Sequence, residues 1–401
     1  MAKIISSLVN QIKPSPTLAI TEKAMAMKAA GINVISLSAG EPDFDTPDNI
    51  KLAAIKAIQN GNTKYTPVDG TRALKQAVQD KFVRENNLKF DLDQITVGSG
   101  AKQVIFNALL ASINPGDEVI IPAPYWVSYP EMVIFAGGTS VIVECLMSSG
   151  FKLKPVDLEK SITSRTKWLI LNSPSNPTGA VYSPQELQEI AKALLKYPQV
   201  YILCDDIYEH ITFDQFQFNS LATIEPKLSN RILTVNGLSK GYSMTGWRLG
   251  YAGGPKELIA AISTVQSQST SNPCSISQAA GVEALVGPQE FVREKANIFQ
   301  KRRDLVLDRI DDITGLSCSK PGGAFYLFPN CSALLGTKSP KGALIASSVD
   351  IAAYLLEEAL VAVVPGSAFG MEGFFRISYA TSESNLDIAL KRIKEACEKL
   401  I

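Results

Sequence analysis

The strongest constraint on the fold is the regular alternation of two hydrophobic patterns along most of the chain. Short runs rich in β-branched and apolar residues, such as EVIIP, TKWLILN and VYILCDD, alternate with helical patterns such as residues 184–196. Strand and helix patterns that alternate in this way are typical of a mostly parallel sheet covered by helices on both faces. The sequence therefore predicts an α/β protein with such a sheet at its centre.

The same patterns predict where the individual elements lie. Helices are expected at residues 17–30, 47–60, 71–85, 101–112, 184–196, 289–310, 347–360 and 383–400. Strands are expected at VISLSAG, ITVGSG, EVIIP, TSVIVEC, TKWLILN, VYILCDD, RILTVNG, RLGYAGG, AFYLF and FFRISYA. Prolines and glycines near the ends of several of these segments support the predicted starts and ends of the helices.

The character of the sequence changes near residue 289. A long charged helix leads there to the turn PGG, two strand patterns and two further helices. A chain of 401 residues is also longer than one compact core usually requires. We therefore expect a large domain at residues 41–288 and a smaller α+β domain at 289–401. Residues 1–40 are expected to form an N-terminal arm and part of the small domain.

Charge and cysteine content exclude several classes of function. The chain has 39 basic and 39 acidic residues, which argues against an electrostatic hold on nucleic acid or acidic lipid. Its six cysteines are scattered without a CxxC pair, and the single histidine, His210, excludes a multi-histidine metal site. We expect no metal, no nucleic acid and no membrane partner. The start of the chain lacks a signal-peptide pattern, so we expect a cytoplasmic protein.

Loops at the carboxyl ends of the predicted strands carry unusual residues, and ligands of such sheets bind there. The segment GSGAK at 98–102 could bring backbone N–H groups and a helix N-terminus to an anion. The segment NSPSNPTGAVYS would hold the amide of Asn176 on a rigid loop. Each of these features alone is also explained by an ordinary tight turn.

Three further loops carry ionisable side chains. Asp205 ends a strand pattern, where a partly buried carboxylate needs a cation or donors, although helix capping is an alternative, and Tyr208 follows three residues later. Lys240 stands among Gly, Ser and Met, surroundings that favour a neutral, nucleophilic amine suited to a Schiff base. Arg248 could bind a phosphate, and Arg376 inside FFRISYA needs an anion such as a substrate carboxylate. This combination of groups matches a site for pyridoxal phosphate.

Nearly the whole sequence resembles the class I, fold-type I aminotransferases that depend on pyridoxal phosphate, most closely the bacterial-type aspartate aminotransferases. The motifs that carry this resemblance are LSAGEPDFDTP, KYTPVDGTRALKQA, PYWVSYPEM, NSPSNPTGAVYS, DDIYEH, GLSKGYSMTGWRLGY, SQSTSNP, GGAFY and FRISYATSE. The resemblance implies the fold of that family, the cofactor pyridoxal 5′-phosphate and a homodimer with shared active sites. It also implies ping-pong transfer of the amino group of L-aspartate to 2-oxoglutarate, which forms oxaloacetate and L-glutamate.

The resemblance implies a role for each matched residue. Lys240 would bond the cofactor and move the substrate proton, Asp205 would pair with the pyridine nitrogen, and Tyr208 would donate to the ring's 3-oxygen together with Asn176. The other implied cofactor contacts are Trp126 on the ring, Gly100, Ala101, Lys102 and Arg248 at the phosphate, and Tyr65 from the other subunit. The implied substrate contacts are Arg376 at the α-carboxylate, Gly40, Trp126, Asn176, Lys102 and Thr17.

Two departures from the family pattern bear on the substrate. No arginine precedes the SNP segment at 271–273, where animal-type relatives bind the distal carboxylate, so we expect Lys102, with Thr17 near the entrance, to meet that group. Gly237 leaves no hydroxyl where some relatives have a serine at the phosphate. Prephenate or aromatic keto acids as acceptors, and a β-lyase or a synthase on the same fold, remain alternatives. A non-enzymatic regulator is disfavoured, because we see no segment for a DNA-binding domain.

Overall fold

The computed structural model describes residues 4–12 and 16–401, with the side chains of 16–19 left out. The α-helices of this described part are α1 (Pro16–Ala29), α2 (Asp48–Gln59), α3 (Arg72–Asn86), α4 (Ala101–Ser112), α5 (Ser128–Phe135), α6 (Pro155–Ser161), α7 (Pro184–Leu195), α8 (Leu221–Ile224), α9 (Lys256–Ser267), α10 (Ser275–Val286), α11 (Glu290–Asp311), α12 (Ser348–Glu358) and α13 (Glu383–Cys397). The strands are β1 (Ile35–Ser36), β2 (Ile95–Gly98), β3 (Glu118–Ala123), β4 (Thr139–Glu144), β5 (Thr166–Asn172), β6 (Tyr201–Asp205), β7 (Ile232–Gly237), β8 (Gly250–Gly253), β9 (Tyr326–Leu327), β10 (Val361–Ala362), β11 (Val364–Pro365) and β12 (Phe375–Ser378).

Most of the described strands form a central sheet in the order β2-β8-β7-β6-β5-β3-β4. Strands β7, β6, β5, β3 and β4 run parallel to one another, whereas β8 is antiparallel to both of its neighbours, β2 and β7. The prediction of a mostly parallel sheet is therefore confirmed. The sequence pattern of β8 carries no information about its direction.

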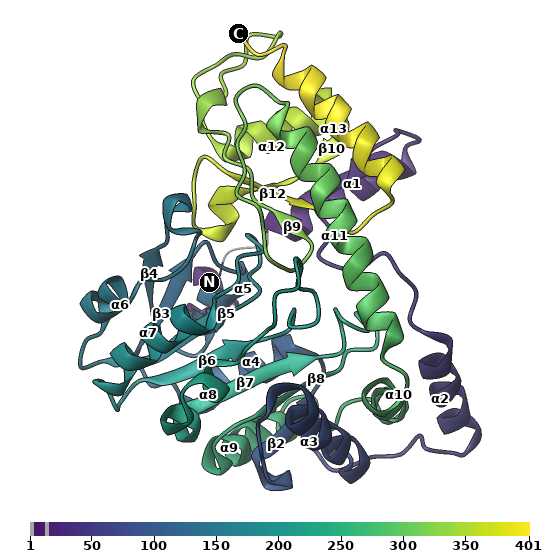
Figure 1. Cartoon of the computed structure of the whole chain (residues 1–401), viewed down its shortest axis with the longest axis vertical. Coiled ribbons are helices and arrows are strands. Elements are labelled where there is room, and N and C mark those ends of the chain that lie inside the picture. The colour runs from purple at the N-terminus through teal and green to yellow at the C-terminus, as the bar shows by residue number, and fades with distance from the viewer. Residues whose placement is uncertain (1–3, 13–15) are drawn as a thin grey trace.

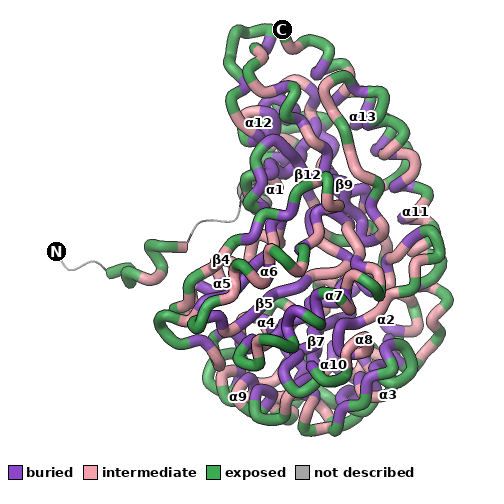
Figure 2. The backbone as a smooth tube through the Cα atoms, turned by 60° about the vertical axis from the view of Figure 1, so that its left-hand side comes forward, coloured by how far each residue is buried: buried purple, intermediate pink, exposed green. Residues whose placement is uncertain are grey.

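Alternating side chains of the central sheet enter two separate hydrophobic cores. On β6, Leu203 packs with residues of α4, α5 and α9, whereas Ile202 and Cys204 pack with residues of α3, α7, α8 and α10. Successive residues of a strand point to opposite faces, so a strand buried on both sides must be apolar throughout. The apolar run at residues 202–204 of β6 follows from this double burial. Figure 2 shows buried colour concentrated inside the molecule, around the labelled β5 and β7, and exposed colour along much of its outline.

A second region is built around a smaller sheet with the order β11-β12-β9, in which both pairings are antiparallel. This sheet shares a core with α11, α12 and α13. Figure 1 shows the region above the central sheet, with α11 running between the two. Strand β1 pairs with β10, so the segment before residue 40 packs against this second region. The domain boundaries at 40/41 and 288/289 stay a prediction.

Most of the expected elements are present within a few residues of their predicted ends. Helices α5, α6, α8, α9 and α10 and strands β10 and β11 were not among the predicted elements. The strand patterns VISLSAG and AFYLF yield strands of two residues each, β1 and β9. Within the described ranges, no helix combines the length and apolar character needed to cross a membrane.

Candidate active site

A cavity of about 440 Å³ lies where the loops after β5, β6 and β7 meet the second region. Ten of the predicted site residues line it: Gly40, Ala101, Lys102, Trp126, Asn176, Asp205, Tyr208, Lys240, Arg248 and Arg376. The first nine come from the segment between residues 40 and 248, and Arg376 comes from β12. The fold thus brings most of the predicted residues together, because the carboxyl ends of parallel strands share one edge of a sheet.

Three predicted residues lie elsewhere or outside the description. Gly100 is adjacent to the cavity lining, and a Cβ atom on it would lie 2.4 Å from Arg248 Nη2. Its φ of +94° also favours glycine, so this residue permits the arginine to approach the turn before α4. Tyr65 is 92% exposed and lies outside the cavity of this chain. Thr17 falls among the side chains that the structure does not describe.

Asp205 stands at the end of β6 and is almost fully buried. Its Oδ2 accepts a hydrogen bond of 2.6 Å from the Tyr129 hydroxyl, and its Oδ1 accepts one of 3.4 Å from the N–H of Ile207. Burial raises the pKa of this carboxyl to about 6, although both hydrogen bonds and the charge of Lys240 oppose the rise. The capping alternative is wrong, since the next described α-helix, α8, begins only at Leu221.

Lys240 follows β7 and points into the same cavity. Its Nζ donates a hydrogen bond of 2.5 Å to the carbonyl of Gly40 and lies 5.9 Å from the centre of the Tyr208 ring. Burial and then the positive charge of Arg376 lower its pKa to about 8. About a tenth of this amine is therefore neutral at pH 7, far more than for an ordinary lysine, and a nucleophile requires the neutral form.

Arg376 is a buried cation with neutral partners. Its Nη1 donates to Asn176 Oδ1 at 2.9 Å and its Nη2 to the carbonyl of Ser38 at 2.7 Å, while its buried Nε has no hydrogen-bond partner. The Asn176 loop is itself fixed, because the N–H of Asn176 donates to Asn172 Oδ1 at 2.8 Å. A buried guanidinium without a carboxylate partner favours binding of an anionic ligand.

A second cationic corner of the cavity surrounds the start of α4. Lys102 Nζ lies 4.9 Å from the centre of the Trp126 ring, and its pKa is lowered by burial and by the charge of Arg248. Arg248 donates to the carbonyls of Thr245 and Ser99 at 3.0 and 3.3 Å. The first turn of α4 has no side-chain cap. Two cations beside a free helix N-terminus could hold a phosphate.

Four cations line the cavity: Lys102, Lys240, Arg248 and Arg376. None of them lies within 4 Å of a carboxylate oxygen of the described residues. The carboxyl groups of the lining are the buried Asp205 and the exposed Glu41, so four cations face two acids and the lining is cationic overall. This imbalance indicates that the cavity binds a ligand with several negative charges.

Two tyrosines of the cavity were missed by the sequence reasoning. Tyr129 donates to Asp205, and the hydroxyl of Tyr326 lies 2.8 Å from that of Tyr208. A weak signal was present, since Tyr129 lies in the motif PYWVSYPEM and Tyr326 in GGAFY. Their partners are far away in the sequence, so the pairing itself required the structure.

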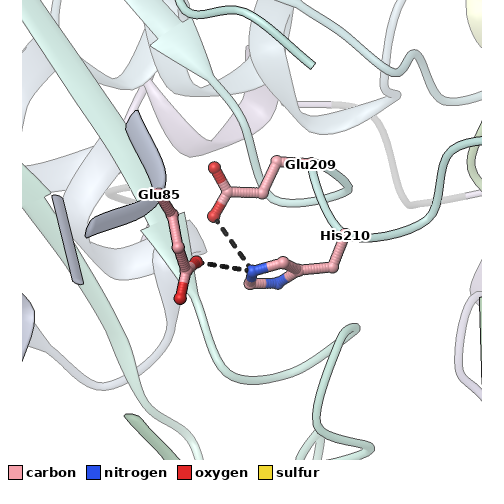
Figure 3. A group of neighbouring side chains, drawn as sticks. All are labelled: Glu85, Glu209 and His210. Atoms are coloured by element: carbon pink, nitrogen blue, oxygen red, sulfur yellow. Dashed lines mark hydrogen bonds and ion pairs between the residues drawn. The ribbon is translucent and has the colours of Figure 1, made fainter. Parts of the chain in front are cut away.

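A second group of ionisable side chains lies just after Tyr208. Figure 3 shows His210 Nε2 facing Glu85 at 2.8 Å and Glu209 at 3.6 Å. Buried Lys81 contacts both carboxylates, and Asn86 donates to Glu209 at 2.7 Å. The cluster thus already contains its own cation and donors, and the contacts of His210 indicate a structural role for this residue.

Comparison with known proteins agrees with this fold. Residues 32–393 match the family model described as aminotransferase class I and II. The chain therefore belongs to this family of aminotransferases. A protein of Rickettsia prowazekii named "probable aspartate/prephenate aminotransferase" is 59% identical over 99% of this chain and 100% of its own length. The aspartate aminotransferase of Rhizobium meliloti is 56% identical over 98% of this chain and 96% of its own length.

Solved structures give the same result for the fold. A crystal structure of the Rhizobium meliloti aspartate aminotransferase has a TM-score of 0.97 and 55% identity, and covers 100% of both chains. The Thermus thermophilus aspartate aminotransferase with maleate has a TM-score of 0.91 and 43% identity over 98% of this chain and 100% of that one. The family and the fold that the sequence motifs implied are confirmed.

Proposed function

We propose that this chain is an aspartate aminotransferase that uses pyridoxal 5′-phosphate to move the amino group of L-aspartate to 2-oxoglutarate. The observation that supports this most is the cavity in which Lys240, Asp205 and the unpaired Arg376 meet. Each of these groups is costly to bury without a ligand, and the proposed cofactor and substrate supply the missing partners.

The cavity fits the proposed cofactor. A protonated ring nitrogen would suit Asp205, whose raised pKa of about 6 reflects a buried acid without a cation. The corner at α4, with Ala101, Lys102 and Arg248, would hold the phosphate. The remaining proposed contacts are Trp126 on the ring, Asn176 and Tyr208 at the 3-oxygen, and Gly100 beside the phosphate. When bound, pyridoxal phosphate supplies an electron sink for the bond at the substrate's α-carbon.

The residues of the chain would then carry out binding and proton movement. Arg376 binds the α-carboxylate, with Asn176 and Gly40 beside it. Lys240, with its pKa lowered to about 8, takes the proton from the α-carbon and delivers it elsewhere in the cavity. Exclusion of water by the surrounding Trp126 and Tyr208 strengthens each charge interaction.

Aspartate is proposed as the donor because a cation is available for its second carboxylate. Lys102 lines the cavity and is not engaged by a carboxylate of the described residues. The names of the relatives support the same substrate. The name of the Rickettsia relative also favours prephenate as a second acceptor, which would occupy the same two cationic corners through its two carboxylates.

The proposal includes a cytoplasmic homodimer with shared sites. Its support is the exposed position of Tyr65 and the exposed apolar side chains Leu52, Ile55 and Ile58 on α2, which suit contact with a second copy. Tyr65 would reach the partner's phosphate. Thr17 near the entrance and the division into domains at 41–288 and 289–401 belong to the same proposal.

A panel of substrates tests the reaction. Purified protein loaded with pyridoxal 5′-phosphate should convert aspartate and 2-oxoglutarate with parallel-line kinetics, the sign of ping-pong exchange. Prephenate and phenylpyruvate replace 2-oxoglutarate in the second arm. Absence of transfer from aspartate to any of these acceptors would refute the proposal.

Mixed dimers test the shared site. Tyr65→Ala and Lys240→Ala subunits should each be impaired alone, whereas hybrids carry one site with an intact Lys240 and a partner's intact Tyr65. Hybrids should therefore exceed both parents in activity. Hybrids that do not exceed the Tyr65→Ala parent would show that Tyr65 does not act across subunits.

A further inference from the structure

Two buried tyrosine hydroxyls face each other at the boundary between the central sheet and the second region. Tyr208 follows β6, Tyr326 begins β9, and their oxygens are 2.8 Å apart. Both side chains line the cavity and are buried. The motif that contains Tyr326, GGAFY, was noted in the sequence, but no role was assigned to this residue.

The ring of Tyr326 also contacts the cation of the cavity. The guanidinium carbon of Arg376 lies 4.5 Å from the centre of this ring, closer than its distance of 5.1 Å to the ring of Phe369. A guanidinium above an aromatic face is held in a fixed plane without losing its N–H donors. The ring of Tyr326 thus adds an aromatic contact to the two neutral hydrogen-bond partners that hold Arg376.

We infer that Tyr326 is a positioning residue, which holds Arg376 with its ring and orients the Tyr208 hydroxyl with its own. The inference rests on the proposed function, in which Arg376 binds a carboxylate and Tyr208 donates to an oxygen of the cofactor. One hydrogen bond joins the two hydroxyls, so only one of them donates in it. When Tyr326 donates, the proton of Tyr208 is available to the cavity.

The charges around the pair favour this direction. Burial raises the pKa of both hydroxyls, so both keep their protons near neutral pH. The charge of Arg376 opposes that rise at both hydroxyls and is the largest opposing influence at Tyr326. At Tyr208 the neighbouring Tyr326 and Asp205 add to the rise, so Tyr326 is the more acidic hydroxyl and the better donor. The other ionisable groups near the pair are Asp205, which acts on Tyr208, and Lys240, which lies 5.9 Å from the Tyr208 ring.

An accepted hydrogen bond makes a hydroxyl a stronger donor. Loss of the Tyr326 hydroxyl should therefore weaken donation by Tyr208 and leave more negative charge on the acceptor oxygen in the cavity. That charge holds a nearby proton more tightly, so the visible absorbance of the holoenzyme should titrate at higher pH. A residue with a purely structural role would not move this midpoint.

Tyr379 provides a matched control. It is a fully buried tyrosine of the same core cluster, its hydroxyl donates to the carbonyl of Ala324 at 3.2 Å, and it does not line the cavity. Tyr379→Phe therefore removes a buried hydroxyl and a hydrogen bond without touching the cavity.

The experiment measures two quantities in holoenzyme carrying Tyr326→Phe, Tyr326→Leu, Tyr208→Phe or Tyr379→Phe. In Tyr326→Phe the absorbance midpoint should rise by about half a pH unit, and Tyr208→Phe should shift it further in the same direction. The affinity for succinate, an unreactive dicarboxylate, should fall about tenfold in Tyr326→Leu but less than about twofold in Tyr326→Phe, which keeps the ring. Tyr379→Phe should match the wild type in both.

A midpoint for Tyr326→Phe equal to that of Tyr379→Phe, or wild-type succinate binding in Tyr326→Leu, would overturn the inference while the wild type still transaminates aspartate. A wild-type protein that forms no visible chromophore with pyridoxal phosphate, or a Tyr208→Phe variant with an unmoved midpoint, would instead count against the proposed function. The two failures are thus distinguishable.

Discussion

Two groups of buried charges each take one carboxylate from the segment that ends β6 and follows it, Asp205 in one group and Glu209 in the other, yet the two groups are organised in opposite ways. The cavity group contains Asp205, Lys240 and Arg376, which contact hydroxyls, carbonyls and amides rather than each other. The group that follows contains Lys81 and Glu209, which form a direct ion pair beside His210. One group is left open for a ligand, and the other is satisfied by the chain itself.

The comparison separates stability from function. A buried pair with complete hydrogen bonding holds its segments together, and the removal of one member leaves a buried charge. Buried charges without partners reduce stability, but they bind whatever ligand supplies the opposite charge. Substitutions in the closed group should therefore change unfolding, whereas those in the cavity should change chemistry.

Lys240→Ala should have the largest effect. Loss of the amine removes both the nucleophile and the proton carrier, so transamination should fall by at least a factor on the order of 10³. Activity with aspartate and the visible absorbance of added pyridoxal phosphate measure this, and circular dichroism checks the fold. Turnover near the wild-type rate would remove Lys240 from the mechanism.

Lys81→Met should break the closed group. The side chain of Lys81 is fully buried, and its loss leaves Glu209 without its cation, so the free energy of unfolding should fall by about 3–5 kcal/mol. Urea unfolding measures this, and a Lys81→Met/Glu209→Gln double variant should recover part of the loss. An unchanged midpoint would mean that the pair contributes nothing. The kcat of the folded variant should stay within about threefold.

Lys102→Ala sharpens the comparison within the cavity. If Lys102 meets the distal carboxylate, its loss should lower kcat/KM for aspartate by about a hundredfold, because one partner of a buried charge pair is removed. Phenylalanine, which has no distal carboxylate, should be affected much less. Equal losses with both donors would restrict Lys102 to holding the phosphate.

Asp205→Asn should abolish function yet stabilise the protein without cofactor. The folded carboxyl has a pKa of about 6, above its ordinary value of 3.8, so the folded state binds more protons than the unfolded state between these values. Stability from this group is therefore complete below about pH 4 and is lost as the pH rises through 6. The variant should gain about 2–3 kcal/mol at pH 7.5.

Urea unfolding of cofactor-free protein across pH 4–8 measures this gain, which should disappear near pH 4. A gain that is independent of pH, or a loss of stability at pH 7.5, would contradict the assigned burial cost of Asp205. Glutamine at Glu209 is the useful contrast, since the pKa of Glu209 is lowered: burial raises it, but the charges of Lys81 and His210 and the hydrogen bond from Lys81 together outweigh burial.

Much of the fold followed from local patterns. Apolar runs such as that of β6 and the helical period of α7 identify elements because burial on one or two faces dictates the residue types. The antiparallel direction of β8 did not follow. Its packing depends on Gly250, where a Cβ atom would lie 2.1 Å from the N–H nitrogen of Ala101. That contact joins segments far apart in the sequence.

The site was predictable where a residue type is unusual for its place. Lys240 among small residues and Arg376 inside an apolar strand are costly without a ligand, and that cost is visible in the sequence. Tyr129 and Tyr326 could not be found in this way, because a buried tyrosine is common in any core. The hydroxyls of Tyr129 and Tyr326 are placed in the site only by their hydrogen bonds to Asp205 and Tyr208.

The pairing of β1 with β10 has a consequence for the order of folding. Ile35 aligns with Val361, more than three hundred residues later, and β1 leads directly to Gly40, which holds Lys240. Closing a loop of that length costs conformational entropy before the contact repays it, and contacts between distant segments form slowly. Refolding protein should therefore bury Trp168, in the core of the central sheet, before it recovers the site, so catalytic activity should return later than the fluorescence change of that residue.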